Sequence, residues 1–228
     1  MKTKARTPDS RAIPPKPMAQ GVRVAQHTTL DTRENILQSA TLIFSKYGYE
    51  GATVQKISKA AKSVDRMIYY YFGSKEGLFI AVLEKIYREM NHAESMIELN
   101  TDDPHRSLRE VIEFVMNYYQ DHPEFITLLN TENLHQGRHI AKSLHAAQYS
   151  SPAVNVIKTI LKSGQKMGLF RTDIKALDVY LLIVSTNYFY VSNRFTLSAF
   201  LGRSLQDRKA VLSWKKFVTE TVLRTVQI

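Results

Sequence analysis

Apolar residues recur at helical spacing along most of the chain, and no stretch of any length alternates in the manner of a strand. Between residues 31 and 47 the apolar side chains fall every three or four positions and share one helix face. They are Ile36, Leu37, Ala40, Ile43, Phe44 and Tyr47. Gly48 follows them as a C-terminal cap. The pattern therefore predicts an all-α protein whose first core helix ends at Gly48.

Two short helices and one long helix are predicted next. Thr53 is a good N-cap for a second helix, and a third begins near Ser63. Gly73 and Ser74 interrupt that helix, and a fourth runs from Lys75 to about residue 98. The first helix and the two short helices after it predict a compact three-helix unit, and the long fourth helix joins this unit to the rest of the chain.

The remainder of the chain is also predicted to be helical. Prolines at positions 104, 123 and 152 fall at helix starts, where a missing N–H costs nothing. The expected helices span residues 105–121, 123–135, 138–149, 152–167, 174–195 and 208–226. This divides the chain into a basic tail (1–30), a compact three-helix domain (31–77) and a larger helical domain (78–228).

The 174–195 segment is apolar on nearly every side and must be covered on every side. A second subunit is a natural source of part of that cover. We therefore expect a homodimer held by a four-helix bundle of the 152–167 and 174–195 helices. The expected interface residues are Val154, Ile157, Leu161, Gly164, Val184 and Tyr188.

The first 30 residues contain four prolines and no apolar period, which predicts a tail without helix. Their six Lys and Arg residues face one Asp, and such an arm either stays solvated or lies along a phosphate backbone. The N-terminus lacks the apolar stretch of a secretory signal. The longest apolar run, residues 179–184, is too short to span a bilayer.

Charge gives the first indication of function. The chain carries 31 Lys and Arg against 21 Asp and Glu, a net charge of +10. Residues 1–90 hold 15 basic and 8 acidic residues, so most of the excess lies in the first two-fifths. Such an excess indicates a polyanionic partner, either nucleic acid or a membrane surface, or alternatively a solvated face that aids solubility. The absence of cysteine fits a reducing cytoplasm.

Four aromatic rings stand in a row at residues 69–72, and on a helix they cannot all face one core. If Ile68 and Phe72 face inward, Tyr69 and Tyr70 project outward. The second helix, a tight turn and this third helix form a helix-turn-helix, whose second helix enters the major groove. Arg66 is then placed to contact a guanine.

The segments "YGYEGATVQKIS" and "YYYFGSKEGL" resemble the DNA-binding region of the TetR family of transcriptional regulators over residues 31–80. The resemblance implies a ligand-responsive regulator, most often a repressor. Such a regulator binds a palindromic operator as a homodimer and is released when a small molecule enters its C-terminal domain. Carried over position by position, the resemblance implies DNA contacts by Thr53, Gln55, Lys62, Asp65, Arg66, Met67, Tyr69, Tyr70, Tyr71 and Lys75.

One position departs from the family pattern. The turn between the second and third helices usually reads Ala-Gly-Val-Ser, whereas this chain has Ala61-Lys62-Ser63-Val64. Because lysine replaces glycine, the turn must either avoid a positive φ or accept its cost. Lys62 is also a possible additional phosphate contact.

A helical-bundle metalloprotein or a metal-sensing regulator is the alternative interpretation. Glu89 and His92, and likewise Glu132 and His135, have the spacing used by di-iron bundles, and His135 and His139 form an i, i+4 pair. The chain has no glycine-rich phosphate loop and no nucleophile elbow. We therefore expect no catalytic residue, no cofactor and no metal.

The effector pocket is expected in the middle of the second domain. Polar or amphipathic groups next to apolar stretches are typical of a mostly apolar pocket. The candidates of this kind are Tyr118, Asn130, Asn133, His135, Arg138, Asn187 and Tyr188. Each of them is equally compatible with a purely structural role.

Overall fold

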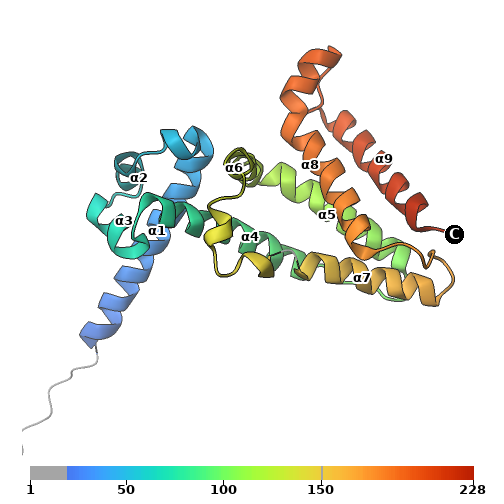
Figure 1. The fold of residues 1–228 in the computed structure, drawn as a ribbon, viewed down its shortest axis with the longest axis horizontal. Coiled ribbons are helices and arrows are strands. Elements are labelled where there is room, and N and C mark those ends of the chain that lie inside the picture. Colours follow the sequence, from blue (N-terminus) through green and yellow to red (C-terminus); the bar gives the residue numbers. More distant parts are fainter. Residues whose placement is uncertain (1–19, 150) are drawn as a thin grey trace, which may run out of the picture.

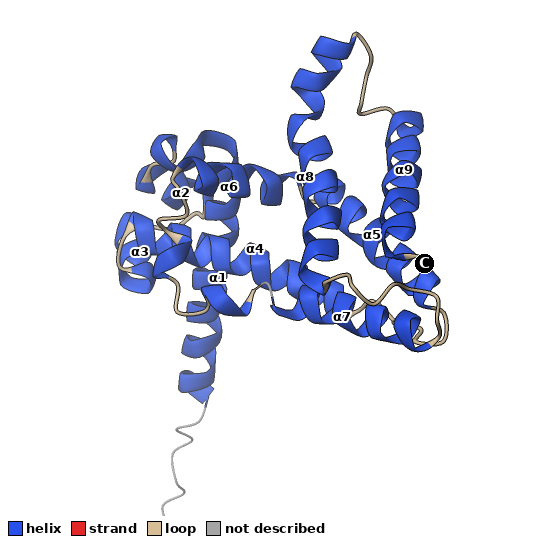
Figure 2. Cartoon of the chain, turned by 45° about the vertical axis from the view of Figure 1, so that its right-hand side comes forward, coloured by secondary structure: helices blue, strands red, loops and turns tan. Residues whose placement is uncertain are grey.

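A computed structural model describes residues 20–149 and 151–228, and within them the fold is all-α, as predicted (Figure 2). Helices α1 (Gln20–Gly51), α2 (Val54–Ala60) and α3 (Asp65–Phe72) form one lobe, at the left of Figure 1. Helix α4 (Lys75–Ser95) leads from this lobe into the second one. The helix-turn-helix unit and its linking helix therefore exist where the sequence placed them.

Helix α1 begins earlier than expected. It is helical from Gln20, so residues 20–30 belong to a helix rather than to the predicted tail. Pro17 is the last proline before this helix, and residues 20–51 contain no proline that would interrupt it. Residues 1–19 lie outside the described residues. At the other end, Gly48 has φ +68°, and this kink ends the long helix at the predicted position.

The second lobe consists of five longer helices. They are α5 (Pro104–Asp121), α6 (Pro123–Leu134), α7 (Ser151–Lys166), α8 (Ala176–Leu201) and α9 (Arg208–Val226). Helices α8 and α9 run side by side in both ribbon views (Figures 1 and 2). These five helices were predicted, with α8 extending six residues beyond its expected end.

The helix predicted over residues 138–149 is wrong. Two short 3₁₀ helices, η1 (Ile140–Lys142) and η2 (Ala146–Gln148), take its place. Between them, the Ser143 hydroxyl donates to Glu84 Oε1 at 2.6 Å and accepts the N–H of His145. A side chain that bonds to α4 and to its own backbone competes with helix propagation. This contact with α4 cannot be seen in the local sequence.

One apolar core runs through both lobes. Phe44 of α1 and Phe79 of α4 meet edge to face with ring centroids 4.9 Å apart. The core continues along α4 through Val82 and Ile86 into the second lobe. Helix α4 therefore belongs to the packed core of both lobes. Among the described residues, no helix is long and apolar enough to cross a membrane.

Candidate DNA-binding surface and effector pocket

The helix-turn-helix is fixed by apolar burial and by side-chain bonds at its ends. Ile57 of α2 and Ile68 of α3 are fully buried, as the sequence predicted. The Thr53 hydroxyl accepts the N–H of Lys56 and caps α2. The amide of Asn35 on α1 donates to the carbonyl of Ala61 at 2.8 Å and so ties the turn to the first helix. No local sequence pattern indicates that bond, because the partners are 26 residues apart.

The turn between α2 and α3 has a strained backbone conformation at Lys62. Lys62 has φ +49°, the left-handed conformation that glycine adopts without cost. For an L-residue this conformation costs about 1–2 kcal/mol. The lysine side chain is exposed beside α3. Strained backbone conformations cluster at functional positions, so the strain at Lys62 supports a functional role for its side chain.

Three side chains project outward from α3. Arg66 is exposed, and Tyr69 and Tyr70 are 52% and 75% exposed. The outward orientation of both tyrosines is thereby confirmed. Phenol hydroxyls donate to phosphate oxygens, and a guanidinium reads guanine through two parallel bonds. Together with Lys62 they give the second helix of the motif a basic, donor-rich outer face.

Three other predicted DNA contacts turn partly inward. Asp65 is half-buried, and its carboxylate accepts a hydrogen bond from the Ser58 hydroxyl of α2. Met67 packs against the core. Tyr71 is half-buried, and in the described part of the chain its hydroxyl has no hydrogen-bond partner. Asp65 therefore has a structural role between α2 and α3, while Thr53 and Gln55 stay exposed on α2.

Lys75 is held at the start of α4. Its ammonium group lies 4.6 Å from the centre of the Tyr49 ring and 3.5 Å from the carbonyl oxygen of Glu50. Lys56 lies in the same way over Tyr47, at 4.4 Å. Lys56 was not among the basic residues predicted to contact DNA. Its position follows from the kink at Gly48, which brings Tyr47 next to α2.

Replacing Lys62 with glycine is expected to separate its strain from its charge. Lys62→Gly should stabilise the fold by about 0.5–1 kcal/mol, because glycine adopts φ +49° freely. Loss of the cation should lower the slope of log K against log[salt] for DNA by about 1 per subunit. Denaturant unfolding and anisotropy titrations measure the two effects. Lys62→Ala is the matched control and should lose affinity without becoming more stable.

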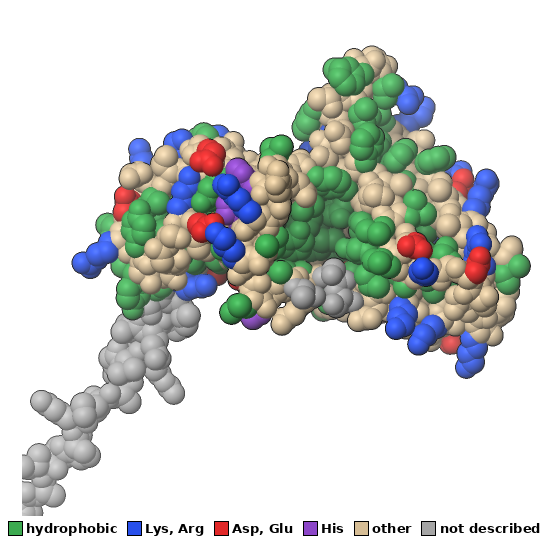
Figure 3. Space-filling view, viewed as in Figure 1, with side chains coloured by type: hydrophobic (Ala, Val, Ile, Leu, Met, Phe, Trp, Pro, Cys, Tyr) green, Lys and Arg blue, Asp and Glu red, His purple; other side chains and the backbone are tan. Residues whose placement is uncertain are grey.

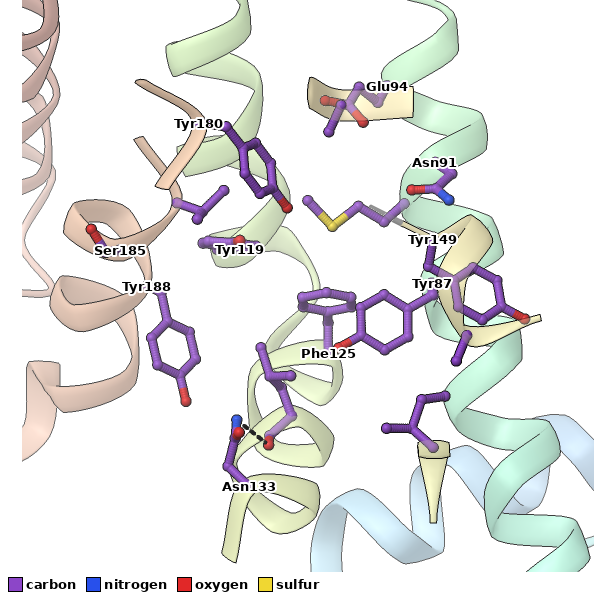
Figure 4. A pocket seen from close by; sticks show the side chains of 16 residues that line it. Tyr87, Asn91, Glu94, Tyr119, Phe125, Asn133, Tyr149, Tyr180, Ser185 and Tyr188 are labelled. Carbon is purple, nitrogen blue, oxygen red and sulfur yellow. Dashed lines mark hydrogen bonds between the residues drawn. The ribbon is translucent and has the colours of Figure 1, made fainter. Parts of the chain in front are cut away.

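A pocket of about 440 Å³ lies between α4, α5, α6, η1, η2, α7 and α8 (Figure 4). Figure 3 shows a hollow with apolar walls near the middle of the molecule. The lining residues are Tyr87, Met90, Asn91, Glu94, Tyr119, Phe125, Leu129, Asn133, Ile140, Ala146, Tyr149, Ala153, Tyr180, Val184, Ser185 and Tyr188. Size and composition are those of a small-molecule site.

Two of the seven predicted ligand residues, Asn133 and Tyr188, line this pocket. The other five are not among its lining residues. Asn130 bonds to Tyr188 and Ser192, and the Asn187 amide donates to the carbonyl of Ile183.

The three remaining candidates also lie outside this pocket. Tyr118 stacks on His122 with ring centroids 4.2 Å apart, and His135 packs edge-on against Tyr49. Arg138 is exposed. Helix contacts between distant segments decide which polar groups reach the cavity, and the sequence pattern does not contain them.

Glu94 is the acidic residue of the pocket and was missed from the sequence. It is 4% exposed, and its Oε2 atom has no hydrogen-bond partner in the described part of the chain. Burial raises the pKa of its carboxyl to about 7. One signal was available: Leu78, Val82, Ile86 and Met90 mark the buried face of α4 at four-residue spacing, and Glu94 is the next position.

Glu94→Gln is expected to stabilise the protein in a pH-dependent way. The folded-state pKa of about 7 exceeds the ordinary value of 4.5, so the folded state holds the proton more tightly. The resulting destabilisation of the wild type develops as pH rises from 4.5 to 7 and stays constant above it. The variant should be more stable by up to about 3 kcal/mol at pH 8 and little changed at pH 4.5. Urea unfolding at both pH values measures this difference, and an equal difference at both would contradict it.

The predicted dimer residues on α7 are already covered by their own chain. Ile157 and Leu161 are buried, and a Cβ on Gly164 would lie 2.1 Å from Cδ2 of Phe170. Gly164 thus makes room for the Phe170 ring, not for a second subunit. Val154 is half-buried, and Val184 and Tyr188 face the pocket. Ile157, Leu161 and Gly164 therefore offer no exposed apolar surface to a second subunit.

Exposed apolar residues lie on α8 and α9 instead. On α8 they include Leu177, Leu181, Phe189, Phe195 and Phe200, and on α9 Leu212 and Phe217. The α8 residues fall mainly on one side of the helix at helical spacing. An exposed apolar strip of this length marks an interaction surface.

The metal-site alternative is not supported by the positions of its residues. The Glu132 carboxylate accepts the backbone N–H groups of His139 and Ile140, and its Oε2 lies 2.7 Å from Nδ1 of His139. Glu89 is paired with Lys85. Within residues 20–149 and 151–228, no group of three His, Asp or Glu side chains converges in a way that would hold a metal ion.

The fold and the α2–α3 surface define a helix-turn-helix DNA-binding regulator with a separate helical ligand domain. Residues 36–82 match the family of bacterial regulatory proteins called the tetR family, and residues 104–222 match the tetracyclin repressor-like C-terminal domain. The chain belongs to the TetR family, which confirms the class of protein that the sequence predicted.

Relatives and solved structures agree with this assignment. The HTH-type transcriptional repressor NicS of Pseudomonas putida is 50% identical over 204 residues, which are 90% of this chain and 95% of NicS. The repressor SCO4008 of Streptomyces coelicolor is 28% identical over 68% of this chain and 75% of its own length. A TetR regulator from Haloarcula marismortui shares the fold with a TM-score of 0.68 at 17% identity, covering 87% and 99% of the two chains.

Proposed function

We propose that the protein is a transcriptional repressor that binds a palindromic operator as a homodimer in the cytoplasm and is released by a small-molecule effector. The observation that carries the proposal is the outer face of α3, where Arg66, Tyr69 and Tyr70 stand exposed on a helix locked by Ile68. The similarity to the repressor NicS supports repression rather than activation. No catalytic role is proposed.

The dimer is proposed to form through the exposed apolar residues of α8 and α9. Two such surfaces related by a two-fold axis cover each other, because an isologous interface uses the same patch twice. The two α3 helices then present themselves to successive turns of the major groove. This requires an operator whose half-sites are one helical turn apart or a multiple of it.

The pocket has a direct structural connection to the DNA-binding lobe. Ile140 lines the pocket, and the adjacent His139 packs on Tyr49 and Phe79 with ring centroids 4.5 and 5.0 Å away. Tyr49 in turn carries the ammonium group of Lys75 on its ring. We propose that an effector displaces η1 and thereby shifts the start of α4, which alters the spacing of the two α3 helices.

Substitutions at Arg66 and Tyr69 are expected to have different consequences. Arg66→Ala should relax sequence preference at one position in each half-site, at about 1–3 kcal/mol per lost base contact. Tyr69→Phe should weaken binding to all sequences alike, because a phosphate contact carries no sequence information. Selection of DNA from a random pool with each variant measures both effects. An unchanged operator preference for Arg66→Ala would contradict the assigned role of α3.

The proposal is tested by recovering bound duplexes from a random pool and titrating the selected operator at several salt concentrations. Several phosphate contacts per subunit predict a slope of log K against log[salt] of roughly −5 or steeper. The selected sequence should be a palindrome. Salt-independent binding, or no binding to any selected duplex, would overturn the proposal.

A further inference from the structure

Six aromatic rings line the pocket. They come from α4, α5, α6, the residue that follows η2, and α8, and are Tyr87, Tyr119, Phe125, Tyr149, Tyr180 and Tyr188 (Figure 4). Tyr87 stacks on Tyr149 with centroids 5.4 Å apart and meets Phe125 edge to face at 5.6 Å. The rings are therefore braced against one another, so the cavity and the ring faces on its wall exist before any ligand enters.

The charge in the pocket is of one sign. Glu94 stands at one end of the cavity in Figure 4, and no Lys, Arg or His belongs to the lining in the described part of the chain. Its Oε2 atom lacks a hydrogen-bond partner there. A buried acceptor without a partner is costly to the free protein and is satisfied most directly by a donor that the ligand brings.

We propose that the pocket binds a protonated nitrogen base, an organic amine or nitrogen heterocycle whose N⁺–H donates to Glu94 while its carbon skeleton lies against the tyrosine rings. The inference rests on the proposed function in so far as it takes this pocket to be the effector site. It adds the chemical class of the effector, which neither the family nor the helix-turn-helix defines.

Two features of the pocket favour a cation. The negative faces of Tyr and Phe rings attract ammonium and pyridinium groups, more strongly where water is excluded. Glu94 is only 4% exposed in the free protein, so ligand binding removes little further surface of its carboxylate from solvent. An anionic ligand would instead meet a second negative charge without a basic partner among the lining residues described.

The affinity for an amine that stays protonated up to pH 8 should increase with pH. Burial alone raises the pKa of Glu94 to about 7, and no charged group of α5, α7 or α8 adds to the shift in the described part of the chain. The phenols that face it, Tyr119 of α5 and Tyr180 of α8, also have raised pKa values and remain neutral. Ionised Glu94 therefore becomes about tenfold more abundant between pH 6 and pH 8.

A matched set of probes tests the proposal by calorimetry on the full chain. The probes 1-naphthalenemethylamine, 1-naphthalenemethanol and 1-naphthoate share one ring system and differ in the charge of the substituent. The amine should bind at least tenfold more tightly than either of the others, and about tenfold more tightly at pH 8 than at pH 6. In Glu94→Gln both the preference for the amine and the pH dependence should disappear. Retained unfolding cooperativity shows that this variant is folded.

Three results would overturn the inference: tighter binding of 1-naphthoate than of the amine, unchanged amine affinity in a folded Glu94→Gln variant, and no amine binding at millimolar concentration. Operator binding is measured separately on the same samples. If the amine binds as expected but no operator can be selected, the proposed function fails and the ligand class stands. If operator binding is normal and the amine does not bind, the ligand class fails alone.

Discussion

Phe189→Arg is expected to turn the dimer into monomers and to lower operator affinity by more than 100-fold. Phe189 lies on α8, is 57% exposed in the single chain, and borders a surface hollow between α8 and α9 that also includes Trp214 and Phe217. At the centre of a two-fold interface, two arginines would face each other in an apolar seam, where unpaired charge is strongly disfavoured. The monomer should stay folded, because the side chain is exposed in it.

Light scattering and anisotropy with the selected operator measure the two consequences. The control is Leu144→Arg, which places the same charge at an apolar residue that is 93% exposed in the loop between η1 and η2. The control should remain dimeric and bind DNA normally. A Phe189→Arg protein that stays dimeric would show that the interface does not use this face of α8.

Glu132→Ala is expected to destabilise the protein by about 3–5 kcal/mol, because it removes a buried acceptor from three donors. The backbone N–H groups of His139 and Ile140 and the Nδ1 atom of His139 would lose their common partner. The His139 ring also packs on Tyr49, so the orientation of the DNA-binding lobe should loosen and operator affinity should fall. Urea unfolding and anisotropy measure both effects.

Two further substitutions make this result specific. Glu132→Gln keeps an oxygen for the two backbone N–H groups and should recover most of the stability. Glu124→Ala removes a carboxylate of the same helix that is paired with His122 near the surface, and should cost less than about 1 kcal/mol. Equal losses for Glu132→Ala and Glu124→Ala would mean that the junction of η1 with α6 is not held by Glu132.

The DNA-binding lobe was largely predictable because its pattern is local. Gly48, Thr53 and Ser74 mark helix ends through their own backbone and side-chain chemistry, and all three act there. Tyr69 and Tyr70 are exposed because helical spacing requires it once Ile68 is buried.

The conformation of Lys62 was not predictable. Both alternatives were open in the sequence, and only the packed turn decides that the lysine accepts φ +49°.

The effector pocket and the dimer surface depended on contacts between segments far apart in the chain. Leu161 and Gly164 form an apolar stripe that suits either a partner or the chain's own core, and the return of Phe170 onto Gly164 makes it core. Glu94 continues the four-residue spacing of an apolar face, yet its burial depends on α5 and α8 closing over α4.

The sequence by itself determined most of the helices, the caps at Gly48, Thr53 and Ser74, and the outward face of α3, because each depends on neighbours within a few positions. The tertiary structure decided which apolar faces are covered and which remain exposed, and it enclosed Glu94 among tyrosine rings. Burial is a property of the whole packed chain, and helical periodicity shows that a face is apolar without showing what lies against it.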